Sequence, residues 1–393
     1  MRSVLISAGD ASGDQIAADF VRALRERSPT TRFLGLTGRE MEAAGVERVA
    51  DQRSLAVGGF GELLPEAPRI VGAWRKMVAA LRRVEPDLVV LIDSGGFNLP
   101  FAGLVRRRSR ARILYFVPPQ VWAWRKGRLA RLARRSDRIA VVLPFEPAFY
   151  ASEGVEVDFV GHPILDRSVP LLDAGERRRA RARLGFAGDR PLVGLFPGSR
   201  RNELARHLGR QLAAVAQLRQ QRPDLAELEV VIGLAASLDR RDVERQVRET
   251  GVRAKILQGS VALLDVIDVA LAKPGTITLE LMLRERPMVV MGRAQALSAA
   301  ILRRSLRVDW MAMPNLIAGK EIVPELLQSA ARPDRIADAL APLFARHGGA
   351  SGQTEEAARQ VDALRRAGAR LGVPGATSRV AEIAEELLGT DRT

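Results

Sequence analysis

Residues of the types that bind phosphate stand between an apolar run and a helical pattern in the second half of the sequence. The apolar run covers residues 191–195, and FPGSRRNE follows it at 196–203. Backbone N–H groups at a helix start carry partial positive charge, glycine lets a ligand approach the chain, and an arginine can hold two phosphate oxygens. We therefore expect Ser199 and Arg200 to bind a phosphate group.

A comparable turn opens the chain, where SVLISA at 3–8 is followed by GDASGD at 9–14. Two halves that begin in this way indicate two nucleotide-binding domains. Neither turn has the spacing of a P-loop or of G-x-G-x-x-G, so phosphoryl transfer and dinucleotide redox chemistry are disfavoured.

A carboxylate stands at the end of another apolar run. Asp93 follows LVVLI at 88–92 and precedes the flexible turn SGGFN at 94–98. A carboxylate at a strand end beside such a turn is well placed to act as a general base. An aspartate that only caps the next helix is the alternative.

Two of the four tryptophans lie close together in a proline-rich loop after the apolar run 113–117. Aromatic faces beside an arginine suit a sugar or acyl ligand. Two tryptophans at this spacing are hard to bury on one helix face, so we expect Trp122, Trp124 and Arg125 to line a cleft. Packing of the tryptophans in the core is the alternative.

A further turn, KPGTITLE at 273–280, closes the apolar run 269–272 and opens a helical pattern. Gly275 and Thr276 would stand at an anion-friendly helix start, and Glu280 one turn later can accept hydrogen bonds from ribose hydroxyls. The same pattern also occurs in ordinary helix capping.

Short apolar runs alternate with longer amphipathic stretches, which is typical of parallel α/β layers. The predicted strands are 4–8, 33–36, 88–92, 113–117, 139–143 and 159–160 in the first half, and 192–196, 229–232, 255–257, 269–272 and 288–291 in the second. Beyond 330 only helices are predicted, at 333–346, 355–371 and 377–388. Ligands of such sheets bind at the carboxyl ends of the strands, which is where the turns above lie.

Composition narrows the class of protein. The 393 residues suffice for two domains, and a boundary is predicted near residues 161–163. The absence of cysteine excludes disulfides and thiolate chemistry, and the three histidines lack metal-ligand spacing, so neither a metal nor a cofactor is expected. Every apolar run is too short to span a bilayer, which favours a cytosolic protein.

The chain is strongly basic, with a net charge of +15. In the window 106–138 Asp137 is the only acidic residue among many arginines. Such a window is either a solvated face or a surface for an anionic partner. No pattern of a nucleic-acid-binding fold is present, so a peripheral role at an anionic membrane is favoured over nucleic acid.

Taken together, these segments resemble the lipid-A-disaccharide synthase family, glycosyltransferases that build the β-1,6-linked glucosamine disaccharide of lipid A. The likeness covers nearly the whole chain. The family motifs occur in order as SAGDASGD at 7–14, AVGGFGE at 56–62, ID with FN at 92–98, VWAWR at 121–125, LPFE with FY at 143–150, GH at 161–162, PGSR at 197–200, GT with LE at 275–280 and PNLIAG at 314–319.

The resemblance implies a GT-B fold: an α/β protein of two Rossmann-like, doubly wound parallel-sheet domains, with a helical C-terminal tail that crosses back to the first domain. Residues 1–165 would form the acceptor-side domain, 166–350 the UDP-sugar-binding domain, and 351–393 the helices that pack on the N-terminal domain. It also implies metal-independent inverting chemistry. The donor would be UDP-2,3-diacylglucosamine, the acceptor 2,3-diacylglucosamine 1-phosphate, and the products the disaccharide 1-phosphate and UDP.

The resemblance also assigns roles to residues. Asp93 matches the family aspartate proposed as base for the acceptor 6-hydroxyl, and Arg200 matches the arginine associated with the UDP diphosphate. Glu280 and Asn315 fall in segments that contact UDP. The complete set of expected site residues is Asp93 and Asp10 for catalysis and Ser12, Gly13, Trp122, Trp124, Arg125, Ser199, Arg200, Gly275, Thr276, Glu280 and Asn315 for binding.

The family carries a hydrophobic membrane-facing patch in the region that matches residues 62–81. Together with the basic window this predicts a cytoplasmic protein that associates peripherally with the anionic inner membrane. An ordinary amphipathic core helix is the alternative. Family members can associate through their C-terminal parts, so a homodimer is possible. The expected patch residues are Leu63, Leu64, Ile70, Val71 and Trp74.

Three residues depart from the family pattern. Asp10 replaces the usual glutamate, Gly96 replaces a second aspartate, and Lys273-Pro274 stands where serine is usual. These departures leave two alternatives to the synthase: another UDP-sugar enzyme of this fold, including its epimerase-like branch, or a catalytically silent, membrane-peripheral UDP-sugar binder. The synthase is favoured.

Overall fold

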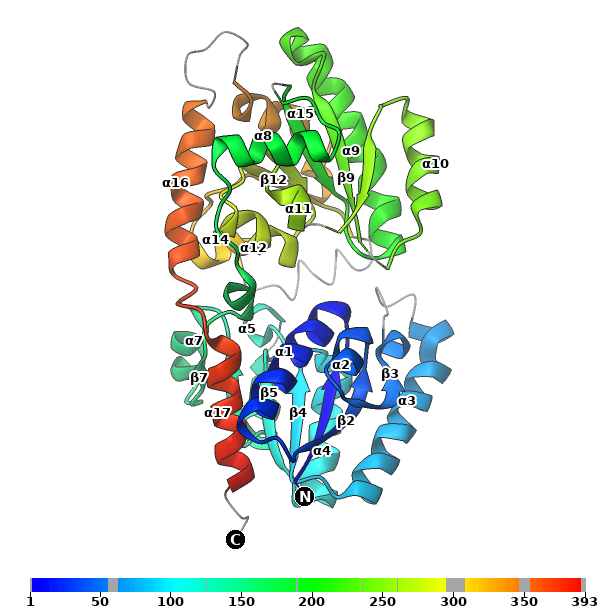
Figure 1. Ribbon diagram of the computed structural model, residues 1–393, viewed down its shortest axis with the longest axis vertical. Coiled ribbons are helices and arrows are strands. Elements are labelled where there is room, and N and C mark those ends of the chain that lie inside the picture. The colour runs from blue at the N-terminus through cyan, green and yellow to red at the C-terminus, as the bar shows by residue number, and fades with distance from the viewer. Residues whose placement is uncertain are drawn as a thin grey trace. The chain divides into compact units, whose positions relative to one another are not determined.

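The computed structural model describes residues 2–55, 63–124, 126–188, 190–235, 237–259, 261–294, 308–345 and 354–389. They fall into two compact units, the first of residues up to 167 together with those from 371 onward, and the second of residues 168–370 apart from 305–307 (Figure 1). Each unit has its own parallel sheet, and each is described by itself.

The sheet of the first unit has the strand order β3-β2-β1-β4-β5-β6-β7, and all its pairs are parallel. Its register is set so that Ala8, Ile92 and Phe116 lie side by side, which brings the ends of β1, β4 and β5 to one level. The strands are β1 (Ser3–Ala8), β2 (Arg32–Thr37), β3 (Glu47–Asp51), β4 (Leu88–Ile92), β5 (Arg112–Phe116), β6 (Arg138–Val141) and β7 (Asp158–Phe159).

Helices cover both faces of this sheet. One face holds a core with α3, α4 and α6, in which Met77, Phe101 and Leu132 are fully buried. On the other face α17, the last helix, packs against α1 (Figure 1). The helices are α1 (Ala11–Arg27), α2 (Arg39–Ala43), α3 (Leu63–Val84), α4 (Gly95–Arg108), α5 (Val121–Trp124), α6 (Lys126–Arg135), α7 (Glu146–Ser152) and α17 (Ala376–Gly389).

The sheet of the second unit is also parallel, in the order β10-β9-β8-β11-β12-β13. Phe196 at the end of β8 pairs with Ala272 at the end of β11, and Ala272 pairs with Val290 of β12. The strands are β8 (Leu192–Phe196), β9 (Glu229–Leu234), β10 (Lys255–Gln258), β11 (Val269–Ala272), β12 (Met288–Gly292) and β13 (Glu325–Leu327).

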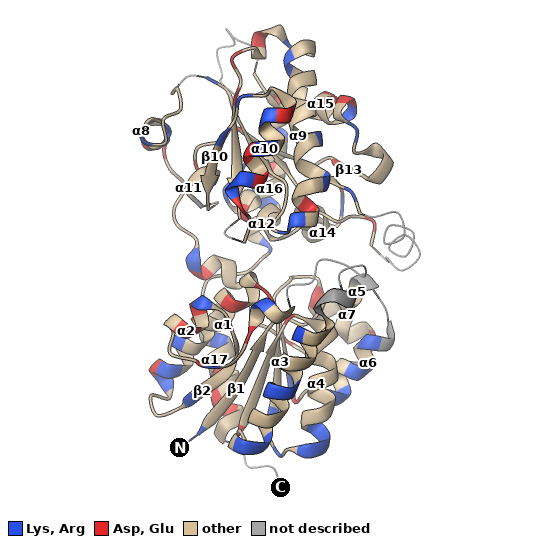
Figure 2. Ribbon diagram, turned by 90° about the vertical axis from the view of Figure 1, so that its right-hand side faces the viewer, with Lys and Arg blue, Asp and Glu red and all other residues tan. Residues whose placement is uncertain are grey.

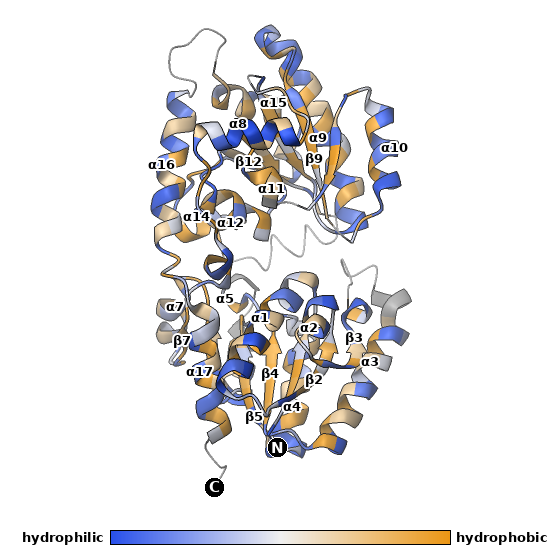
Figure 3. Ribbon diagram, viewed as in Figure 1, coloured by the Kyte–Doolittle hydropathy of each residue, from blue (hydrophilic) through white to orange (hydrophobic). Residues whose placement is uncertain are grey.

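The helices of the second unit cover its sheet in the same way. A core on one face joins the sheet to α9 and α15. The helices are α8 (Ala174–Arg183), α9 (Arg201–Gln221), α10 (Arg240–Thr250), α11 (Val261–Leu264), α12 (Thr276–Leu283), α14 (Met313–Ala318), α15 (Pro333–Leu340) and α16 (Glu355–Ala369). The hydrophobic colour of the inner strands in Figure 3 follows from this arrangement, because strands covered on both faces are apolar throughout.

The two parallel sheets confirm the predicted fold class, with differences at the edges. The strands β3 and β13 were not predicted, and the predicted helix 333–346 ends as α15 at Leu340, followed by a 3-10 turn at Ala341–Leu343. The C-terminal residues were expected to pack together on the first domain. In the structure α16 packs on α12 and α14 of the second unit, and α17 alone returns to the first.

Hydrogen bonds to Asp166 hold the start of α17 in the first unit. Asp166 lies just before the chain first passes into the second unit. The carboxylate of Asp166 accepts hydrogen bonds from the backbone N–H groups of Gly375 at 2.6 Å and Thr377 at 2.9 Å. At the other end of the helix, Arg27 of α1 lies 2.9 Å from Glu385. The first unit is therefore completed by residues from both ends of the chain.

Candidate active site

Asp93 comes directly after β4 at the carboxyl edge of the first sheet, and its side chain is exposed. Asp93 and the next residue, Ser94, both have a φ of +46°, a left-handed conformation that non-glycine residues rarely adopt. Such backbone persists only where its surroundings hold it, and it is commonest at functional sites.

Two buried side chains hold the Asp93 backbone. Its carbonyl accepts hydrogen bonds from the Tyr115 hydroxyl at 2.8 Å and from Asn98 Nδ2 at 3.1 Å, and its N–H donates to the Val117 carbonyl at 3.0 Å. Asn98 Oδ1 also accepts a hydrogen bond of 2.6 Å from the hydroxyl of Ser7, so it joins the ends of β1 and β4. The sequence did not predict that Ser7 and Tyr115 support the site, because both lie in apolar runs and were expected to be ordinary strand residues of the core.

The first glycine loop lies against Ser94. A Cβ atom built at Gly9 would lie 2.2 Å from Ser94 Oγ, so only glycine fits there. Asp10 caps α1, because its carboxylate accepts a 2.8 Å hydrogen bond from the N–H of Gly13, and Ser12 is exposed. The structure thus gives Asp10 and Gly13 a capping contact, and their catalytic and binding roles stay predictions.

Trp122 packs in the core, which was the alternative to cleft lining. Its side chain is 6% exposed, its ring meets Phe145 edge to face at 4.9 Å, and its indole N–H donates to Glu146 Oε1 at 3.1 Å. The side chain of Trp124 and all of Arg125 lie outside the described residues.

Glu146 is a buried carboxylate whose importance the sequence did not reveal. Its Oε2 accepts hydrogen bonds from the N–H groups of Val142 at 3.0 Å and Leu143 at 2.8 Å. Burial raises the pKa of Glu146 to about 7, although these donors and Trp122 favour the charged form. The LPFE segment therefore ties β6, the Trp122 indole and the start of α7 together.

In the second unit the predicted phosphate-binding turn is built around Glu203. Its Oε2 accepts a 3.0 Å hydrogen bond from the N–H of Ser199, and Oε1 lies 3.0 Å from Lys273 Nζ and 3.5 Å from Arg200. Gly198 has a φ of +125°, and a Cβ there would lie 2.5 Å from Glu203 Oε2. Ser199 and the Arg200 side chain are exposed beside this turn.

His207 joins two loops at the same edge of the sheet. Its Nδ1 donates to the carbonyl of Pro197 at 2.8 Å, while Nε2 accepts from the N–H of Arg293 at 3.0 Å. These partners assign the neutral tautomer protonated at Nδ1. Burial lowers the pKa of His207, which favours that neutral form.

The other nucleotide-binding candidates divide into accessible and buried residues. Gly275 has a φ of +152° and precedes α12, Thr276 is exposed and Glu280 is half-buried. Asn315 is fully buried, and its side-chain amide makes hydrogen bonds to other groups of the protein. It donates to Val323 O and Glu325 and accepts from the N–H groups of residues 322 and 323. In this structure Asn315 holds a loop.

The predicted membrane patch lies on α3. Val71 is 45% exposed, whereas Ile70 and Trp74 are half-buried and Trp74 meets Phe97 edge to face at 5.4 Å. The side chains of Leu63 and Leu64 lie outside the described residues. Basic residues mark α4 and α6 in Figure 2. Among the helices described, none is both long and apolar enough to cross a membrane.

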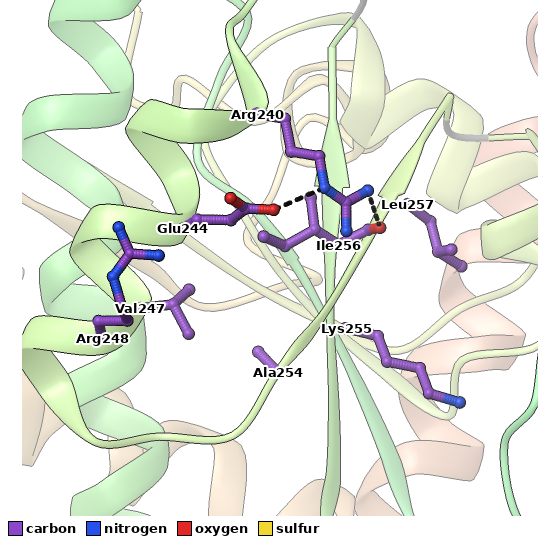
Figure 4. Close-up of a pocket in the computed structure, with 8 residues that line it drawn as sticks. All are labelled: Arg240, Glu244, Val247, Arg248, Ala254, Lys255, Ile256 and Leu257. Carbon is purple, nitrogen blue, oxygen red and sulfur yellow. Dashed lines mark hydrogen bonds and ion pairs between the residues drawn. The ribbon is translucent and has the colours of Figure 1, made fainter.

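A hollow of about 550 Å³ lies between α10 and β10 (Figure 4), and none of the predicted site residues lines it. Arg240 spans it, pairing with Glu244 at 2.7 Å and donating to the carbonyl of Ile256 at 3.2 Å. No group of three or more potential metal ligands occurs in the described ranges.

Solved structures with the same architecture identify the fold. The chain is similar to a putative UDP-N-acetylglucosamine 2-epimerase from Listeria monocytogenes, with a TM-score of 0.64, 14% identity, and coverage of 100% of this chain and 98% of that one. MurG of Acinetobacter baumannii is similar with a TM-score of 0.57, 15% identity, and coverage of 98% and 100%. At these identities the likeness shows the fold, which is GT-B, as predicted.

Sequence comparison then identifies the family. A family model described as Lipid-A-disaccharide synthetase matches residues 4–370. Lipid-A-disaccharide synthase of Geobacter metallireducens is 37% identical over 392 residues, covering 100% of this chain and 98% of the relative. That of Myxococcus xanthus is 36% identical over 390 residues, covering 99% and 98%. The chain belongs to the lipid-A-disaccharide synthase family, which confirms the resemblance and makes it a glycosyltransferase of lipid A biosynthesis.

Proposed function

We propose that this chain transfers the diacylglucosamine unit of UDP-2,3-diacylglucosamine to the 6-hydroxyl of 2,3-diacylglucosamine 1-phosphate, with Asp93 as the general base. The Asp93 carboxylate takes the hydroxyl proton while the oxygen forms a bond to the anomeric carbon of the donor. The bond from that carbon to UDP breaks on the opposite side, which inverts the configuration. The products are the β-1,6-linked disaccharide 1-phosphate and UDP.

The single observation that carries this proposal is the placement of Asp93. It is an exposed carboxylate on a left-handed backbone at the end of a central strand, and buried hydrogen-bond donors fix that backbone. A base on a fixed main chain needs little reorganisation when it accepts a proton, which is what general-base catalysis requires.

Negative charge that develops on the departing UDP needs a fixed positive partner. Arg200 is exposed beside the Gly198 turn at the start of α9, a helix of 21 residues. An arginine and backbone N–H groups that are already in place stabilise such charge more in the transition state than in the ground state. Removal of one donor of this kind typically costs about 3 to 4 kcal/mol of barrier.

We also propose that the first unit binds the anionic inner membrane surface reversibly from the cytoplasmic side. The exposed Val71 on α3 and the basic residues of α4 and α6 supply an apolar and an electrostatic contribution, and two such contributions together support stable but reversible binding. Association as a homodimer stays a prediction.

The decisive test is turnover with both acylated substrates, following UDP and lipid disaccharide by mass spectrometry. Asp93→Asn is expected to lower kcat by about a hundredfold or more, while UDP affinity stays within about twofold of wild type. UDP release without disaccharide would show that another acceptor is used. UDP binding without turnover in the wild type would instead identify a silent binder.

A further inference from the structure

Lys273 belongs to the turn between β11 and α12, and the structure shows where its charge lies. It follows β11 directly, and its backbone N–H donates to the carbonyl of Phe196 at the end of β8 at 3.0 Å. Its Nζ lies 3.0 Å from Glu203 Oε1. The lysine therefore links the turn after β11 to the end of β8 and to the first turn of α9.

The ammonium group also lies beside Gly275, which precedes α12. A Cβ atom at Gly275 would be 3.7 Å from Lys273 Nζ. The side chain of Lys273 is 29% exposed, so the group is held by the protein and still reaches solvent. Pro274 follows, and a residue before proline is restricted to extended conformations, which limits the movement of the Lys273 backbone.

Glu203 anchors this cation. Burial raises the pKa of Glu203, but Lys273, the N–H of Ser199 and Arg200 together bring it below its ordinary value, so the carboxylate is charged at neutral pH. A lone buried carboxylate would repel phosphate. Because two cations share it, the group of Lys273, Arg200 and Glu203 keeps a net positive charge.

We propose that Lys273 is a second cation, beside Arg200, for the diphosphate of the UDP donor, and that Glu203 holds it in place. This inference rests on the proposed function. An ammonium group has three N–H donors, and the contact with Glu203 engages one of them. The others are available to phosphate oxygens, with lysine acting as a point charge and Arg200 as a planar fork.

The experiment compares the binding of UDP and uridine to the full chain by titration calorimetry. In Lys273→Met we expect UDP to bind about ten- to a hundredfold more weakly, as for the loss of a hydrogen bond to a charged group. Uridine, which has no phosphate, should bind within about twofold of wild type. Lys273→Arg, which retains the charge, should recover most of the UDP affinity.

Lys255→Met is the matched control. It removes the same charge from the edge strand β10 of the same sheet, which β9 separates from β8. We expect it to leave both affinities unchanged. Equal losses for UDP and uridine in Lys273→Met would show a purely structural lysine, and unchanged UDP affinity would show that Lys273 makes no contact with phosphate. Either result overturns the inference.

The wild-type titration separates this inference from the proposed function. If wild-type protein binds neither UDP nor uridine, the donor assignment itself fails, and the proposed diphosphate contact fails with it. If wild type binds UDP and only the lysine variant behaves otherwise than expected, the donor assignment stands and the role of Lys273 is refuted.

Discussion

The hydroxyl of Tyr115 donates a 2.8 Å hydrogen bond to the main-chain carbonyl of Asp93. The two residues are 22 positions apart and belong to neighbouring strands and their loops. Burial raises the pKa of Tyr115, and the Asp93 carboxylate adds to this, so the hydroxyl remains a donor. The contact supports the left-handed backbone that carries the proposed base.

Tyr115→Phe should therefore lower kcat by about fivefold and leave KM and UDP affinity nearly unchanged, because about 1 kcal/mol of hydrogen bonding to the Asp93 backbone is lost. Steady-state kinetics with both acylated substrates would measure this. Tyr150→Phe is the control, since the buried Tyr150 hydroxyl has no hydrogen-bond partner within the part of the chain that the structure describes. An equal loss in both variants would contradict a positioning role for Tyr115.

Gly9→Ala should destabilise the protein by about 1 to 3 kcal/mol, because the new methyl group would overlap the side chain of Ser94. Ser94→Gly removes the overlapping atoms and also relieves a left-handed serine. The double variant should then recover most of the loss. Urea unfolding of the two single variants and the double variant would measure the coupling, and simple additivity would refute a direct clash.

Two of the buried groups, Glu146 and His162, should make the stability of the protein depend on pH with opposite signs. The pKa of Glu146 is raised to about 7, so in the range from about 4.5 to 7 the unfolded carboxyl ionises while the folded one does not, and stability falls as pH rises. The pKa of His162 is lowered to about 4 by burial, so between about 4 and 6.5 stability rises with pH. Between about pH 4.5 and 6.5 the two effects oppose each other.

Glu146→Gln separates the two contributions. The free energy of unfolding of wild type relative to this variant should fall by about 3 kcal/mol as pH rises from 4.5 to 7. Urea unfolding at several pH values would measure the difference. A difference that does not change with pH would mean that Glu146 titrates normally in the folded protein.

Val71→Asp should weaken binding to vesicles that contain anionic lipid by more than about tenfold, since a buried valine contributes about 1.5 to 3 kcal/mol and the new charge repels the surface. Val373→Asp is the matched control, because Val373 is in the same unit and is 67% exposed. Cosedimentation with vesicles gives the comparison. Equal weakening in both variants would place the membrane contact elsewhere than α3.

The sequence predicted the central strands because strands covered on both faces are continuous apolar runs, as in LVVLI of β4. The edge strands escaped prediction, since ERVAD of β3 is half polar and β13 has three residues. The candidates Asp93, Ser199 and Arg200 could be proposed from the sequence because each follows such a run. The partners that hold the site could not, because Glu203 with Lys273 and Trp122 with Glu146 meet only after folding.

The position of α17 determines the order in which the protein can be completed during synthesis. Residues 168–370 build the second unit almost alone, whereas the first unit lacks the helix that packs on α1 until residues 376–389 have been made. The N-terminal half therefore emerges from the ribosome first and is finished last. Until α17 arrives, the surface of α1 that it covers is open to chaperones and to aggregation.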